Sequence, residues 1–205
     1  MIQIYGVPGY GSTISELMLT LAGVRYSFIN VDGYDKPGPA REQLEKLNPL
    51  CQVPTLVLEN GTVMTESAAV ALMLLDDHPE LAPAPGTPER NRFLRLLVWM
   101  VANVYPTFTY ADYPERWAPG APAQLRESTG RYRETLYRWL EQQVEGTPWM
   151  FGQDISLLDC YLPVMRRWTP HAAWFAQHTP KLNAIADAVC ALPELQTVLR
   201  ANRIL

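Results

Sequence analysis

Hydrophobic and polar positions divide the first 77 residues into alternating strands and helices. Residues 1–5 alternate apolar and polar and end at a glycine-rich turn, which predicts a strand. Apolar residues then recur at the spacing of one helix face, at Ile14, Leu17, Met18 and Leu21. Thr13 and Glu16 have the spacing of a capping box, and Gly23 is a stop signal, so the helix is expected to lie between them.

Five further elements complete this half of the chain. The pattern predicts strands over 26–31, 53–58 and 62–64, and helices over 40–47 and 65–77. Asn60–Gly61 is a strong hairpin signal between the last two strands. A strand–helix–strand start implies a parallel pair with a right-handed crossover. The resulting order, β-α-β-α-β-β-α, is that of an α/β thioredoxin-like domain.

The second half has no strand alternation. Apolar positions predict helices over 93–104, 125–144, 156–168 and 180–192, and residues 113–122 have the composition of a loop. Four prolines crowd residues 79–88, which is typical of a stiff linker. We therefore expect a thioredoxin-like domain over 1–78, a linker over 79–88 and an all-α helical bundle domain over 89–205.

Composition narrows the classes of function. The 205 residues are 48% hydrophobic and carry a net charge of −4, which suits a folded globule and gives no electrostatic footprint for nucleic acid or anionic membranes. No apolar stretch is long enough for a membrane helix, and the start lacks the features of a signal peptide. Three widely spaced cysteines fit reduced thiols in a cytoplasmic protein, and they form no metal-ligand pattern with the three histidines.

Two short motifs indicate a particular protein family. Residues 48–56 read NPLCQVPTL and residues 65–69 read TESAA. This pair resembles the N-P-x-x-Q/K-V-P-x-L and E-S motifs of the bacterial, cytosolic type of glutathione S-transferase family, and the resemblance covers nearly the whole chain. It implies an enzyme that uses glutathione as a cosubstrate.

The resemblance also assigns the central part of a glutathione site. A Val53–Pro54 peptide can adopt the cis form, which is rare except before proline, and Val53 would then offer its N–H and C=O to the cysteinyl part of glutathione. Ser67 would bind the γ-glutamyl carboxylate at a helix start, beside Glu66 for the ammonium group. Alternatively, Pro54 is purely structural, and Glu66 and Ser67 are ordinary residues of a helix start.

Three more residues are assigned to the edge of this site. Gln52 would lie near the glycine carboxylate of glutathione, and Lys36 could pair with it; both could instead be solvated surface residues. Relatives of this kind form homodimers, and in some of them a polar residue near position 103 reaches the partner's glutathione. Asn103 is the candidate for that role.

A further motif supports the fold alone. Residues 152–159 read GQDISLLD and resemble the G-x-x-x-S/T-x-x-D element of the family's helical domain. Ser156 is expected to cap a helix, and Asp159 to reach back to the N–H of Ser156.

The group that activates the thiol is the open question. A free thiol is only a few per cent thiolate at neutral pH, so a hydroxyl near a helix start is needed to stabilise the anion. The positions where related classes place serine and cysteine are Gly9 and Gly11 here. Ser12 is the first choice, Tyr5 is the runner-up and Thr13 is the third hydroxyl, although Ser12 and Thr13 could simply cap the helix. The absence of cysteine from this loop argues against thiol exchange by the protein itself.

An aromatic-rich stretch follows the linker. We expect a second substrate, a hydrophobic electrophile, to lie between the two halves against Tyr10, Trp99, Tyr105, Phe108, Tyr110, Tyr113 and Trp117. Trp99 could equally belong to the helical core. The first hypothesis is glutathione conjugation. The alternatives are a glutathione-dependent disulfide reductase or peroxidase, and a non-catalytic interaction module with a transferase fold.

Overall fold

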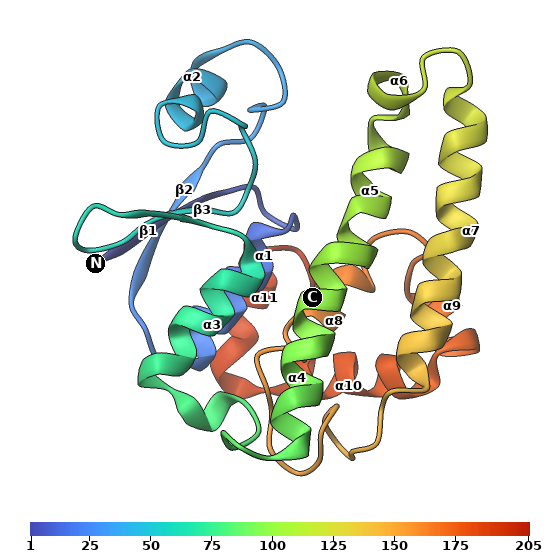
Figure 1. Ribbon diagram of the computed structural model, residues 1–205. Coiled ribbons are helices and arrows are strands. Elements are labelled where there is room, and N and C mark those ends of the chain that lie inside the picture. Colours follow the sequence, from blue (N-terminus) through green and yellow to red (C-terminus); the bar gives the residue numbers. More distant parts are fainter. The chain divides into compact units, whose positions relative to one another are not determined.

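A four-stranded sheet in the order β2-β1-β3-β4 forms the core of the first compact unit, in a computed structural model that describes residues 1–205 (Figure 1). Its strands are β1 (Ile2–Gly6), β2 (Tyr26–Asn30), β3 (Thr55–Val57) and β4 (Val63–Thr65). β1 is parallel to β2, while β3 runs antiparallel to both β1 and β4. The helices of this unit include α1 (Ser12–Leu21), α2 (Pro39–Glu45), α3 (Ser67–Asp77) and the 3-10 turn η1 (Pro79–Leu81). The element order confirms the predicted thioredoxin-like arrangement.

The helix after β1 buries its predicted face. Ile14, Leu17 and Met18 are fully buried, as are Ile4 and Leu56, which are paired across the sheet. Helix α1 does end before Gly23, which has a φ of +68°. Its start differs from the prediction.

The expected capping box of Thr13 and Glu16 does not form. The N-cap is Gly11, which makes no side-chain capping bond. The hydroxyl of Thr13 donates instead to Asn202 Oδ1 (2.8 Å), a residue at the other end of the chain. A long-range partner has therefore replaced the local one.

The second compact unit, Ala82–Ala188, is helical, which confirms the predicted class of the second half. Its elements are α4 (Pro88–Trp99), the π-helical turn η2 (Met100–Val104), α5 (Tyr105–Asp112), α6 (Pro114–Trp117), α7 (Pro122–Glu141), α8 (Tyr161–Met165), α9 (Ala172–His178) and the greater part of α10 (Pro180–Ala191). None of the helices combines the length and apolar character that a membrane crossing requires.

Three local expectations in this unit are wrong. The expected loop over 113–122 contains the short helix α6, and the expected helix over 156–168 is α-helical only at Tyr161–Met165. Asp159 does accept the Ser156 N–H (2.8 Å), as predicted, but the Ser156 hydroxyl also donates to Asp159 (2.8 Å) and caps no helix. The Met150 N–H donates to the other oxygen of Asp159 (3.0 Å), so this carboxylate holds a turn together.

The last segment of the chain returns to the first unit. Val189–Leu205 groups with Met1–Leu81, whereas the sequence had placed it in the helical domain. It contains the 3-10 turn η3 (Pro193–Leu195) and α11 (Gln196–Ala201), and both pack against α1 (Figure 1). This return positions Asn202 beside the loop that follows β1.

Candidate functional site

Strand pairing brings three of the predicted segments to one end of the sheet. Tyr5 in β1 is paired with Thr55 in β3, and Thr55 is paired in turn with Thr65 in β4. The loop after β1, the Val53–Pro54 step before β3 and the start of α3 after β4 therefore leave the sheet at the same end. The sequence predicted these segments separately, and the register of the sheet brings them together.

The Val53–Pro54 step presents backbone groups with no partner. Its peptide bond is cis, as expected. Val53 is half-buried, and neither its N–H nor its C=O makes a hydrogen bond within the protein. Buried or half-buried backbone groups are usually paired, so an unpaired N–H and C=O on one residue suit an extended peptide ligand.

A buried asparagine fixes the loop that carries this step. Asn48 Nδ2 donates to Gln52 O (3.2 Å) and to Thr55 Oγ1 (3.1 Å), and Thr55 Oγ1 donates to Gln52 O (2.8 Å). The sequence alone indicated no role for Asn48 or Thr55, although both belong to the NPLCQVPTL motif. The side chain of Gln52 itself is exposed, as is that of Lys36 in the loop after β2.

The start of α3 combines backbone strain with the N–H groups of a helix N-terminus. Glu66 is exposed and has a φ of +63°, in the left-handed region, at a cost of about 1–3 kcal/mol for a residue with a side chain. The first helical hydrogen bond runs from the Val70 N–H to Glu66 O (3.0 Å), so the N–H groups of the first turn lie before it. Ser67, with 6% of its surface exposed, lies in this turn. An anion at this position would gain both N–H donors and the positive end of the helix.

The geometry argues against Ser12, the first choice for activating the thiol. Ser12 is fully buried, and its hydroxyl donates to Val7 O (3.1 Å) and accepts from the Val7 N–H (3.1 Å). A hydroxyl has one proton to donate, and this one is already used. Ser12 therefore fastens α1 to the end of β1. The position of Ser12 also accounts for the glycine at residue 6, because a Cβ there would lie 2.3 Å from the Ser12 side chain.

Thr13 is engaged in the same way. Its hydroxyl donates to Asn202 Oδ1 (2.8 Å) and accepts from the Gly9 N–H (3.0 Å), and the side chain is fully buried. Asn202 Nδ2 donates to Glu16 Oε1 (2.9 Å). Burial raises the pKa of Glu16 to about 7, against smaller opposing effects of its bonds to Asn202 and Tyr26. The sequence gave Glu16 only a capping role and gave Asn202 none, and nothing local to either residue indicates the contact.

Two kinds of donor remain at this end of the sheet. Hydrogen bonding in α1 begins with the Thr13 N–H, which donates to Tyr10 O (3.0 Å), so the N–H groups of Gly11 and Ser12 come before it and stay open. The Tyr5 hydroxyl has one long contact, to Gln3 Oε1 (3.5 Å). Tyr5 lies in an apolar cluster against which Val53 also packs.

Most predicted substrate-contacting aromatics are paired with other rings or cations. In the second unit, Trp99 stacks at 4.5 Å on Trp139, and Phe108 lies 4.8 Å from Trp168. The remaining predicted rings of this unit show similar contacts: Tyr105 with Trp168, Tyr110 with Trp117, and Tyr113 with the Arg116 guanidinium. Phe108 is buried in the core, which favours a structural role, and Trp99 is half-buried against its partner. Tyr10, in the first unit, is 47% exposed.

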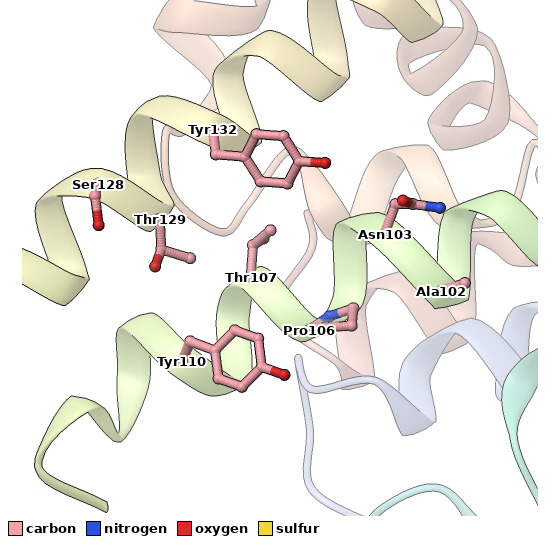
Figure 2. A pocket seen from close by; sticks show the side chains of 8 residues that line it. All are labelled: Ala102, Asn103, Pro106, Thr107, Tyr110, Ser128, Thr129 and Tyr132. Carbon is pink, nitrogen blue, oxygen red and sulfur yellow. The ribbon is translucent and has the colours of Figure 1, made fainter. Parts of the chain in front are cut away.

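One pocket of about 440 Å³ lies within the second unit (Figure 2). Its walls come from the η2–α5 segment and from α7: Ala102, Asn103, Pro106, Thr107, Tyr110, Ser128, Thr129 and Tyr132. It brings together Asn103 and Tyr110, two residues to which the sequence gave different roles. Asn103 Nδ2 donates to Trp99 O (3.1 Å). The lining mixes aromatic rings with hydroxyl groups, and Tyr110 is the one predicted substrate-contacting aromatic that it contains.

Comparison with known proteins now identifies the chain. Residues 12–77 match the family described as "Glutathione S-transferase, N-terminal domain". The uncharacterized GST-like protein YncG of Escherichia coli K12 is 60% identical over 205 residues, which cover 100% of both chains. The chain belongs to the glutathione S-transferase family.

Other members of this family are more distant and carry different names. The glutathione S-transferase GstA of Escherichia coli O157:H7 is 26% identical over 98% of both chains. The disulfide-bond oxidoreductase YfcG of Escherichia coli K12 is 27% identical over 82% of this chain and 81% of its own. A sphingomonad glutathione S-transferase, solved in complex with glutathione, has a TM-score of 0.80 and 25% identity, and the match covers 99% of this chain and 100% of that one. Family membership therefore supports a transferase-like enzyme without fixing its reaction.

Proposed function

We propose that this protein binds glutathione at the end of the sheet and joins it, through its sulfur, to an electrophile. The unpaired N–H and C=O of Val53 carry the proposal, because an extended peptide can pair with them as an added strand. Ser67 and the first turn of α3 receive the γ-glutamyl carboxylate, and the exposed carboxylate of Glu66 receives the ammonium group. Gln52 and Lys36 lie in loops with exposed side chains, available to the glycine carboxylate.

We assign thiol activation to backbone groups in place of Ser12. The open N–H groups of Gly11 and Ser12 lie at the positive end of α1, where they favour the thiolate over the thiol. The Tyr5 hydroxyl is the second candidate donor. In the reaction, the sulfur forms a bond to the electrophilic carbon, and the leaving group departs with its electron pair.

The thiol pKa of bound glutathione tests this assignment. Tyr5→Phe is expected to raise it by about one unit if the phenol contributes, since one unit corresponds to about 1.36 kcal/mol. Ser12→Ala is expected to lower the free energy of unfolding and leave the pKa unmoved. A raised pKa in Ser12→Ala, with wild-type stability, would return Ser12 to first place.

Glutathione-dependent reduction of a disulfide or hydroperoxide is the second candidate function. The relation to YfcG favours it, and so does the engagement of the Ser12 and Thr13 hydroxyls in bonds within the protein. In this reaction the glutathione thiolate attacks a disulfide sulfur and expels a thiolate, or attacks a peroxide oxygen and expels an alkoxide, which takes up a proton. A second glutathione then attacks the resulting mixed disulfide or sulfenic acid, and glutathione disulfide forms as a thiolate or water leaves.

Calorimetry and one panel of assays separate the candidates. Calorimetry with glutathione tests binding, and turnover is then compared with an aryl halide, a hydroperoxide and a small disulfide. Conjugation predicts activity mainly with the aryl halide, whereas the redox function predicts activity with the other two. Binding without turnover would indicate a non-catalytic module. No binding at millimolar glutathione would reject the proposed site.

We also propose a cytoplasmic homodimer that detoxifies apolar electrophiles. The aromatic residues Tyr110 (38% exposed), Tyr132 (54%) and Trp117 (56%) leave apolar surface on the second unit for a second copy or a substrate. None of the three cysteines forms a disulfide, which fits a reducing compartment. Light scattering is expected to give twice the single-chain mass of 23.2 kDa, and the single-chain mass at micromolar concentration would rule the dimer out.

A further inference from the structure

The loop that precedes α1 is tied to the end of the chain by a buried side-chain network. Asn202, 2% exposed, accepts at Oδ1 from the Thr13 hydroxyl (2.8 Å) and from the Gly9 N–H (3.2 Å). Its Nδ2 donates to Glu16 Oε1 (2.9 Å) and to Val198 O (3.0 Å). An amide has two acceptor sites and two N–H donors, so every bonding position of Asn202 is filled.

Backbone contact reinforces this link. Gly9 has a φ of +82°, and a Cβ placed on it would lie 3.3 Å from Asn202 O. The loop therefore lies directly against the residue that follows α11. Its two ends, Gly9 and Thr13, bond the same amide oxygen, and the open N–H groups of Gly11 and Ser12 lie between them.

We propose that Asn202 is a positioning residue for the thiol of glutathione: it fixes the Gly9–Thr13 loop so that its open N–H groups stabilise the thiolate. This inference rests on the proposed function. Asn202 touches neither the sulfur nor the electrophile and acts through the backbone. A donor that stabilises an anion must be held at the correct distance, and a loop released at both ends would lose part of that preorganisation.

Further polar groups surround Asn202 and its partner Glu16. Glu16 faces it from α1, and Tyr26 in β2 donates to the other oxygen of Glu16 (3.2 Å). Thr20 lies one turn further along α1 and donates to Glu16 O (2.7 Å). The bonds that Asn202 and Tyr26 make to the Glu16 carboxylate hold the amide of Asn202 in one orientation, with its oxygen towards the loop.

The thiol pKa of bound glutathione, measured from thiolate absorbance, tests the role of Asn202. Asn202→Ala is expected to raise this pKa by about one unit. At pH values below the pKa, kcat/KM is then expected to fall about tenfold, because one pKa unit changes the thiolate fraction of bound glutathione tenfold. The Kd of glutathione is expected to stay within about twofold, since the contacts at Val53 and Ser67 remain. A merely structural role would lower stability and leave the pKa unchanged.

A pair of threonine variants keeps the test valid if Asn202→Ala does not fold. Thr13→Val removes one bond to Asn202 and is expected to raise the thiol pKa, whereas Thr13→Ser keeps the hydroxyl and restores the wild-type value. Ser15→Ala is the matched control on the same helix, because the Ser15 hydroxyl is buried and has no partner. Equal pKa values in Thr13→Val, Ser15→Ala and the wild type would overturn the inference. Wild-type protein that binds no glutathione would overturn the proposed function instead.

Discussion

The end of the sheet and the turn at Asp159 are built alike and used differently. Each is organised by one buried polar side chain that bonds to loop backbone: Asn48 holds Gln52 and Thr55, and Asp159 holds Met150 and Ser156. At the Asp159 turn, the bonds made to the carboxylate stay within the cluster. At the end of the sheet, the adjacent residue Val53 keeps an unpaired N–H and C=O.

This difference separates a structural motif from a candidate ligand site. A polar cluster that satisfies itself offers nothing to a ligand, and disrupting it leaves buried donors without partners. A cluster that fixes a loop while leaving the next peptide open has groups available to bind a ligand. Both motifs resemble family patterns in the sequence, so the pattern alone does not tell them apart.

The largest effect is expected at the structural turn. Asp159→Ala removes the acceptor for two backbone N–H groups and one hydroxyl, and is expected to lower the free energy of unfolding by about 3 kcal/mol. Denaturant unfolding measures this loss. Glutathione affinity, measured by calorimetry on the folded fraction, is expected to be unchanged. A large loss of glutathione affinity would mean that the Asp159 turn is not purely structural.

The Glu16–Asn202 network beside the Gly9–Thr13 loop is expected to make the free energy of unfolding depend on pH. Because burial raises the pKa of Glu16 from 4.5 to about 7, the folded protein retains a proton that the unfolded chain releases across this window. The Glu16 contribution to stability is therefore fully present below pH 4.5 and is lost as pH rises through 7. Glu16→Gln cannot ionise, and it is expected to be about 2 kcal/mol more stable than the wild type near pH 8.

Unfolding of both proteins at pH 5 and pH 8 tests this prediction. The difference between them should be present at pH 8 and small at pH 5. A constant difference at the two pH values would mean that Glu16 is already ionised in the folded protein at the lower pH.

Ser67→Ala probes the ligand site directly. Removing a hydroxyl that bonds a carboxylate is expected to weaken glutathione binding by about 1–3 kcal/mol. Ser15→Ala is the matched control, because Ser15 is buried in the same unit and its hydroxyl has no partner. If the two variants bind glutathione equally well, the ligand carboxylate does not lie at Ser67.

The smallest change in stability is expected at Glu66, where two substitutions separate the effect of backbone strain from that of charge. Glu66→Gly relieves the positive φ of this residue and is expected to raise the free energy of unfolding by up to about 1 kcal/mol while weakening glutathione binding. Glu66→Gln keeps the strain and removes the charge, so it should weaken binding without stabilising the fold. If both results are observed, the positive φ of Glu66 lowers stability and its carboxylate contributes to glutathione binding.

Local patterns predicted the sheet, its helices and the Val53–Pro54 step because each is specified by neighbouring residues. They did not predict the fate of Ser12 and Thr13. Both hydroxyls lie at a helix start, as the sequence indicated, but folding buries them against Val7 and Asn202. Asn202 is 189 residues from Thr13 along the chain, and no periodicity or motif spans that distance. The assignment of Val189–Leu205 to the helical domain failed for the same reason.

The order in which a ribosome makes this chain matters for the loop before α1. Met1–Leu81 emerges first, but the partner of Gly9 and Thr13 emerges only after the whole of Ala82–Ala188 has been synthesised. During that interval the nascent sheet and its helices lack the amide of Asn202. Since domains tend to fold as they emerge, the thioredoxin-like unit gains its last polar contacts late in synthesis, and a chain broken off early would carry this loop without its anchor.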